Sequence, residues 1–137
     1  MDIKEYISKQ PLERQNILTR INKTILDADK TVKGEVSTMM GKEMIVYKGK
    51  GLMKYGLASG KNYMSLHLLP IYGSAELHSK YKSLLKRANF QKGCINFDTE
   101  EKMPADIVKK LIEDCYSIDL LKIRKDYYRL KNIKSKK

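Results

Sequence analysis

Residues whose side chains could do chemistry recur at every second position in the stretch KNYMSLHL, residues 61–68. Tyr63, Ser65 and His67 would share one face of a β-strand, because successive side chains of a strand point to opposite faces. A histidine beside a hydroxyl can act in base catalysis or bind a ligand. Catalysis also needs a group that orients the imidazole ring, and no acid in this part of the sequence is placed to do so. We therefore expect a binding face at these residues and predict that the protein is not an enzyme.

Two further tyrosines precede this stretch at intervals of eight residues. If hairpin turns centre on Lys50 and Gly60, all three tyrosines share the face that carries the histidine. Such a face could stack on a nucleobase or another planar ligand, and ordinary sheet packing is the alternative explanation. The opposite face would then carry the apolar residues Met44, Val46, Leu52, Gly56, Ala58, Met64, Leu66 and Leu68. The predicted ligand face consists of Tyr47, Tyr55, Tyr63, Ser65 and His67.

A hard cation would bind through carboxylate oxygens, and the densest group of acids is Asp98, Glu100 and Glu101. This group has no EF-hand spacing, and lysines flank it at Lys92 and Lys102. A solvated loop is therefore the preferred interpretation. The two histidines also lack the spacing of a zinc site. We expect no metal ion and no other cofactor from the residues themselves.

Positive charge is concentrated at the end of the sequence. The formal net charge is +12, and residues 122–137 hold eight basic residues against one acid. Such a tail could bind a nucleic acid, an anionic membrane surface or an acidic protein, or it could only increase solubility. The partner thus stays unknown, with nucleic acid or another polyanion as the candidate. The candidate nucleic-acid contacts are Lys122, Arg124, Lys125, Tyr127 and Arg129.

The length and composition are those of one small globular domain. The 137 residues contain no apolar run near the ~20 residues that span a bilayer. Residues 1–10 show no secretory signal, and the two cysteines, Cys94 and Cys115, do not form a C-x-x-C pair. We therefore expect a cytoplasmic protein with reduced thiols, and we expect Cys115 in the core.

The apolar spacing predicts helices near residues 2–8, 12–29, 75–88 and 104–118, and strands near 44–48, 52–58, 63–69 and 94–97. A further short strand is expected at 35–38. The resulting order, α-α-β-β-β-α-β-α, predicts one α+β domain with helices packed on an antiparallel meander. We place this domain at residues 1–121 and a basic, helical tail at residues 122–137.

Three segments together resemble the YdhG-like family, a domain family of unknown function. They are IKEYISKQP, KYGLASGKNYMSLHLLPIYG and FQKGCINFDTEEKMPADIVKKLI, and the resemblance covers about residues 2–118. The resemblance implies a frataxin-like fold, and some relatives carry an intracellular iron-chaperone label. Iron is therefore implied by the family alone, and its binding would use carboxylates.

The sequence departs from the family pattern at two places. Residues 38–42, TMMGK, stand where the family often has an aromatic-Gly-Met-Pro stretch. Asn96 stands where arginine or another polar residue is common.

The acids of the expected first helices are scattered among lysines and arginines, unlike the acidic ridge of a frataxin. The leading expectation is a non-enzymatic binding module, with a nucleic-acid-associated protein and an iron chaperone as alternatives.

Overall fold

The computed structural model describes residues 1–39 and 41–118 of the chain. The helices are α1 (Ile3–Ser8), α2 (Leu12–Ala28), α3 (Leu69–Tyr72), α4 (Ala75–Leu84), the 3₁₀ helix η1 (Glu100–Lys102) and α5 (Ala105–Tyr116). The strands are β1 (Lys33–Met39), β2 (Lys42–Gly49), β3 (Leu52–Ser59), β4 (Met64–Leu68), β5 (Asn89–Phe90) and β6 (Cys94–Phe97). These elements confirm the α+β class, and they add α3, β5 and η1 to the predicted set.

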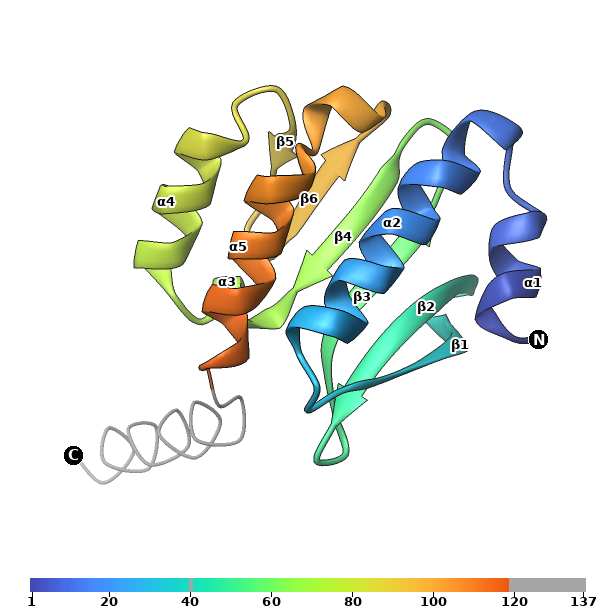
Figure 1. Ribbon diagram of the computed structural model, residues 1–137, viewed down its shortest axis with the longest axis horizontal. Coiled ribbons are helices and arrows are strands. Elements are labelled where there is room, and N and C mark those ends of the chain that lie inside the picture. The colour runs from blue at the N-terminus through green and yellow to red at the C-terminus, as the bar shows by residue number, and fades with distance from the viewer. Residues whose placement is uncertain (40, 119–137) are drawn as a thin grey trace.

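The strands form one antiparallel sheet in the order β1-β2-β3-β4-β6-β5. The strand expected at 35–38 is β1, so the meander has four strands before the chain turns into α3. Figure 1 shows α2 and α5 side by side over one face of this sheet, with α1 beside α2 and α4 beside α5. The molecule is therefore a two-layer domain, with its helices on one side of the sheet.

Local signals in the sequence place the helix starts. The Asp2 side chain accepts a hydrogen bond from the Glu5 amide at 2.8 Å, as in the first half of a capping box. Ser74 caps α4 by accepting a hydrogen bond from the Leu77 amide at 3.3 Å. Pro104 directly precedes α5. Proline lacks an amide hydrogen, and at the start of a helix this has no cost because amides there have no carbonyl partner within the helix. These three starts agree with the sequence prediction.

The hydrophobic core lies between the two layers. Every helix from α1 to α5 contributes buried side chains to it, and Cys115 is among them, as predicted. The sheet contributes alternate residues of its central strands, because only one side of each strand faces the helices. These residues are Ile45, Tyr47, Tyr55, Leu57, Met64, Leu66, Leu68, Ile95 and Phe97.

The predicted register of the hairpin formed by β3 and β4 is wrong. We expected a turn centred on Gly60 that would place Tyr55 opposite Ser65. In the structure β3 pairs with β4 so that Gly56 lies opposite His67 and Ala58 lies opposite Ser65. A shift by an odd number of residues moves every side chain of a strand to the other face. Ser65 and His67 therefore lie on the side away from the helices, and the apolar residues of β4 lie in the core.

A longer loop at residues 60–63 causes this shift. The Gly60 amide donates to the Tyr63 carbonyl oxygen at 2.8 Å, which closes the loop. Arg14 of α2 holds it from the helix side, because its guanidinium donates to Ser59 Oγ at 2.8 Å and to the Gly60 carbonyl at 2.5 Å. The hydroxyl of Tyr6 accepts the Ser59 amide at 3.0 Å. Contacts from both N-terminal helices thus fix the register.

A β-bulge in β3 turns Lys54 toward the end of the helix layer, where it meets a buried acid. Lys54 Nζ lies 2.8 Å from Asp29 Oδ2 and 3.3 Å from the carbonyl oxygen of Tyr116. The hydroxyl of Tyr55 donates to the same carboxylate at 2.6 Å, and the Thr31 amide donates at 3.0 Å. Burial raises the pKa of Asp29, but its hydrogen bonds with Lys54, Thr31 and Tyr55 outweigh burial and leave the pKa below its usual value.

No helix within residues 1–39 and 41–118 is long and apolar enough to cross a membrane. Cys94 and Cys115 are both free thiols, as expected from their spacing. Cys115 is buried, whereas Cys94 is partly exposed.

Candidate ligand-binding face of the sheet

The side of the sheet that faces away from the helices carries a mixed set of apolar, polar and sulfur-containing side chains. We call it the open face and define it by residues of β2, β3, β4 and β6. The register places on it Met44, Val46, Met53, Gly56, Ala58, Ser65, His67, Cys94 and Asn96. Its two buried hydrophobic residues, Met44 and Val46, lie outside the core cluster to which α1–α5 contribute. The open face is therefore a second, separate surface of the sheet.

Gly56 lies at the centre of the open face. A Cβ atom at this position would lie 2.5 Å from Cε of Met44, 2.6 Å from Cε of Met53 and 3.5 Å from Cβ of His67. Glycine leaves room here for the two methionine methyl groups, which occupy the space above its Cα. Val46, the cross-strand partner of Gly56, is completely buried.

Two polar pairs continue the open face across β4 and β6. Ser65 lies opposite Asn96, and its hydroxyl donates to Asn96 Oδ1 at 2.7 Å. His67 lies opposite Cys94, and both side chains are half-buried. The ring of His67 makes no hydrogen bond or ion pair with any other residue in the described part of the chain. The imidazole nitrogens are therefore available to a ligand.

Burial sets the protonation of these two groups. It lowers the pKa of His67, because the charged imidazolium loses hydration on the sheet. It raises the pKa of Cys94, because the thiolate would also be charged. At neutral pH the open face therefore carries a neutral imidazole beside a thiol.

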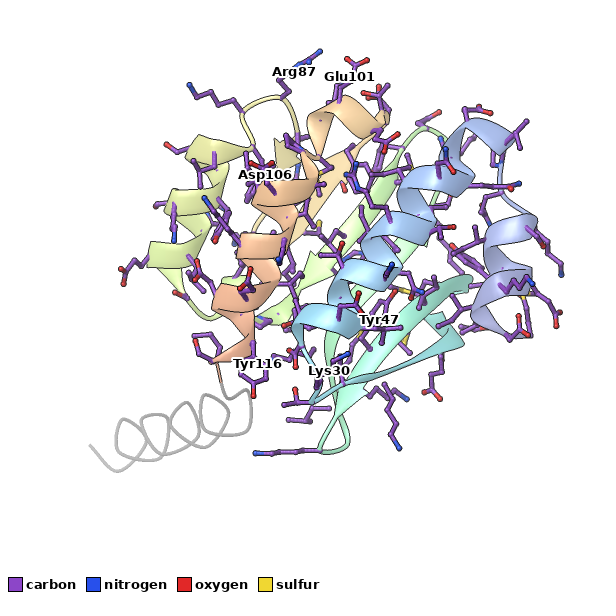
Figure 2. The ribbon with its side chains drawn as sticks, in the orientation of Figure 1. Lys30, Tyr47, Arg87, Glu101, Asp106 and Tyr116 are labelled. Carbon is purple, nitrogen blue, oxygen red and sulfur yellow. The ribbon has the colours of Figure 1, made fainter. Side chains whose placement is uncertain are left out.

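The three tyrosines of the predicted ligand face do not join Ser65 and His67. Tyr47 and Tyr55 lie fully buried on the opposite, helix-covered face, where Tyr47 donates to Asn22 Oδ1 at 2.6 Å. Figure 2 shows Tyr47 between the sheet and α2. Tyr63 precedes β4 in the loop and is 47% exposed. The prediction of a common face for the three tyrosines is wrong, because it depended on the turn centred on Gly60.

The acids of the predicted metal group each contact a different basic residue. Lys102 lies 2.8 Å from Asp98, Arg20 lies 2.8 Å from Glu100, and Arg87 lies 3.7 Å from Glu101. Figure 2 shows Arg87, in the loop between α4 and β5, beside Glu101 of η1. The ion pair with Lys102 lowers the pKa of Asp98. These carboxylates support the turn before α5, and each is already paired with a cation.

The candidate nucleic-acid residues Lys122, Arg124, Lys125, Tyr127 and Arg129 lie outside the residues that the structure describes. Their assignment to a basic tail, and the domain boundary at residue 121, stay predictions.

Two shallow hollows lie elsewhere, on either side of α1. One is lined by residues 1–4 and 34–36, and the other by Ile3, Lys4 and Ile7 of α1 together with the polar side chains Ser8, Gln15, Asn16, Thr19 and Asn22. Neither contains a histidine or a cysteine, and neither reaches the open face. Their chemistry is therefore separate from that of the sheet.

The sequence prediction placed Met44, Val46, Gly56 and Ala58 on the face opposite His67, and it assigned Cys94 and Asn96 to neither face; the register places all six on the open face. Alternation within CINF already places Cys94 and Asn96 together, because residues two apart in a strand share a face. Their meeting with Ser65 and His67 depends on the pairing of β4 with β6, which are separated by α3, α4 and β5. No short-range signal in the sequence specifies that pairing.

The fold has a solved counterpart. A crystal structure of the DUF1801 family protein YdhG from Bacillus subtilis matches with a TM-score of 0.59 at 10% sequence identity. The match covers 80% of this chain and 84% of that chain. No protein-family profile and no curated protein matches the sequence. The structural match confirms the YdhG-like resemblance at the level of the fold.

Proposed function

We propose that this chain, which has the fold of YdhG, is a non-enzymatic binding module whose ligand surface is the open face. The observation that carries the proposal is the row of half-buried polar groups on that face. Ligand sites typically combine apolar surroundings with a few polar groups that fix orientation. Here Met44, Met53 and Ala58 supply the apolar part, and His67 and Asn96 supply directional groups.

Binding fits this surface better than catalysis does. A histidine that acts as a base normally has a partner that fixes its tautomer. Among the described residues, no acid contacts His67 and no base contacts Ser65. The Ser65 hydroxyl instead donates to an amide oxygen, which orients Asn96 and does not activate the serine.

The alternatives receive less support. An iron chaperone would need exposed carboxylates that are free to converge, and the three predicted acids are separately ion-paired. A nucleic-acid platform on the sheet would need exposed aromatic rings, and Tyr47 and Tyr55 are buried. Nucleic-acid binding by residues 122–137 does not depend on the sheet and stays a separate prediction.

The test is fragment mapping by NMR on the full, isotopically labelled chain. A library of small polar and aromatic fragments should shift the amide signals of Ser65, His67, Cys94 and Asn96 more than those of the helices. Asn96→Ala should weaken the binding of those fragments, whereas Asn16→Ala, an exposed amide of α2, should leave it unchanged. Fragments that bind only the helix layer, or no binding at all, would overturn the proposal.

A further inference from the structure

We propose that the hollow between α1 and α2 is a second binding site, and that its ligand is an uncharged carbohydrate about the length of a disaccharide. The two helices lie side by side at one end of the helix layer (Figure 1). The hollow has a volume of about 520 Å³, and small-ligand sites typically have roughly 300–1,000 Å³. It shares no residue with the open face, so this inference goes beyond the proposed function.

The two walls of the hollow differ in chemistry. On the α1 side, Ile3 and Ile7 are four residues apart and form one apolar strip. The α2 side has helical spacing and is polar, and it consists of Gln15, Asn16, Thr19 and Asn22. Seven residues separate the ends of this polar wall, which makes it about 10 Å long at 1.5 Å per residue. The hollow therefore fits an elongated ligand with one apolar side and one polar side.

The polar wall carries no charge, although the rest of α2 is rich in charge. The charged residues of that helix all lie outside the wall: Glu13, Arg14, Arg20, Lys23 and Asp27. Among the described residues, Lys4 is the only charged one that lines the hollow. A site for a nucleic acid or another polyanion would present several cations. The wall therefore favours a ligand that is polar and uncharged.

Hydrogen bonds within the protein fix the amides at the two ends of the wall. Asn22 Oδ1 accepts from the hydroxyl of the fully buried Tyr47 at 2.6 Å, which leaves Asn22 Nδ2 to donate to a ligand. Gln15 Nε2 donates to the carbonyl oxygens of Gln10 at 2.9 Å and Ser8 at 3.3 Å, which leaves Gln15 Oε1 to accept. The wall thus has a donor at one end and an acceptor at the other before any ligand binds, which lowers the cost of ordering them.

The groups between these ends are free to bind. The exposed side chains of Asn16 and Thr19 make no hydrogen bond with any residue in the described part of the chain. An amide and a hydroxyl each offer both a donor and an acceptor. A sugar hydroxyl also does both, and the C–H face of a sugar ring is apolar. A sugar whose hydroxyl groups face α2 and whose ring face packs on Ile3 and Ile7 therefore matches both walls.

A peptide fits this hollow less well. An amphipathic helix binds in a groove that is apolar on both sides, and an extended peptide pairs with the edge of a strand. Here one wall is polar, and every described residue that lines the hollow belongs to a helix. The remaining explanation is that the polar residues of α2 only contact solvent, which the following experiment tests.

The experiment is an NMR titration of the full, isotopically labelled chain with maltose, cellobiose and sucrose. At least one of these sugars should shift the side-chain amide signals of Gln15, Asn16 and Asn22 and the methyl signals of Ile3 and Ile7. The shifts should saturate and should exceed those of the sheet residues. If none of the three sugars shifts these signals, the inference is wrong.

Two substitutions remove single polar groups that hold no other part of the fold. Asn16→Ala and Thr19→Val should each weaken sugar binding by about 2–10-fold, which corresponds to the net contribution of one hydrogen bond. The matched controls Asn89→Ala and Thr99→Val change exposed side chains outside the hollow and should bind as the natural chain does. Sugar binding that Asn16→Ala and Thr19→Val leave unchanged would contradict the inference.

Tyr47→Phe tests whether the amide of Asn22 is held in position. This variant changes no group that contacts the ligand, but it removes the hydrogen bond that orients Asn22. The affinity should fall by a similar factor, and the side-chain amide signals of Asn22 should shift even without sugar. Tyr72→Phe, which changes a tyrosine that is 71% exposed, should alter neither quantity. Urea unfolding of each variant shows whether it is folded, so a loss of affinity is counted only for a folded chain.

Glucose 6-phosphate provides a test of the selection against charge. If it binds the hollow more tightly than the uncharged sugars and loses affinity as salt is added, the site selects negative charge and the inference fails. None of these results affects the open face, because fragment mapping detects binding there through residues of β4 and β6. The proposed function fails only if the fragments do not bind that face.

Discussion

Gly56 gives the sharpest prediction at the scale of single residues. A Cβ at this position would push the methionine methyl groups apart, and those groups end flexible side chains that can move. Because a glycine inside a strand has its own entropic cost, Gly56→Ala should change the free energy of unfolding by no more than about 1 kcal/mol. Urea denaturation of the two chains measures the change.

Gly51 provides the opposite control in the hairpin that joins β2 and β3. Its φ angle is +77°, and a Cβ atom added there would meet no other atom within 4 Å. Gly51→Ala should therefore lower the free energy of unfolding by roughly 1–2 kcal/mol, because alanine disfavours the left-handed backbone. If Gly51→Ala unfolded at the same urea concentration as the natural chain, the left-handed backbone would carry no cost and this prediction would be wrong.

The titration of His67 tests the environment of the open face. Burial favours the neutral imidazole and lowers the pKa of the ring, so the midpoint in a pH series of NMR spectra should lie below 6.5. The sign follows from linkage: below pH 6.5 the unfolded chain takes up this proton before the folded chain does, so stability falls as the pH falls. His67→Gln should lack this part of the acid sensitivity. A midpoint at or above 6.5 would show that the ring is well hydrated or charge-paired.

At the scale of elements, the buried ion pair connects the end of α2 to β3. Lys54→Met leaves the fully buried Asp29 carboxylate with Tyr55 and Thr31 but without its cation. Removing one partner of a buried pair costs about 3–5 kcal/mol, and we expect the low end of that range because those hydrogen bonds remain. The check is urea denaturation at pH 7.

Lys48→Met is the matched control for this pair. Lys48 lies 2.9 Å from Glu35 in a neighbouring strand, and both side chains are about half exposed. Exposed pairs contribute about 0–1 kcal/mol, so this variant should unfold nearly as the natural chain does. Equal losses in the two variants would contradict the importance of the buried pair for joining the layers.

At the scale of the whole molecule, the uneven charge predicts where a polyanion would bind. Replacement of Lys122, Arg124, Lys125 and Arg129 by glutamine in the full chain should greatly weaken binding to a labelled generic DNA. For the natural chain, the logarithm of affinity should fall with the logarithm of salt by about 0.9 for each phosphate contact. Fluorescence anisotropy across a salt series measures both quantities.

A control variant of equal charge separates location from net charge. It replaces the exposed residues Lys82, Lys86, Lys109 and Lys110 of the helix layer by glutamine. If the tail is the contact, this control should retain most of the affinity. Equal loss in both variants would point to a general effect of charge, and no binding by the natural chain would remove the nucleic-acid hypothesis.

The sequence by itself determined the elements, because their signals are local. Asp2 and Ser74 mark helix starts, the apolar spacing gives α2 and α5, and glycines separate β2, β3 and β4. It also placed Ser65 and His67 on one side of β4, because alternation within a strand needs no partner. The class of fold followed from the order of these elements.

Only the tertiary structure decided which face those two residues share, and with what. Burial of Met64, Leu66 and Leu68 against the helices requires the longer loop at residues 60–63, and Arg14 of α2 holds that loop from far away in the sequence. In this register Tyr47 and Tyr55 lie in the core. His67 lies opposite Gly56 on one side and Cys94 on the other, and the methyl groups of Met44 and Met53 lie above Gly56. The alternation of residues in a strand shows only that the strand has one apolar and one polar face. Which face the helices cover depends on the strand register, and the register is set by the free energy of packing the whole domain.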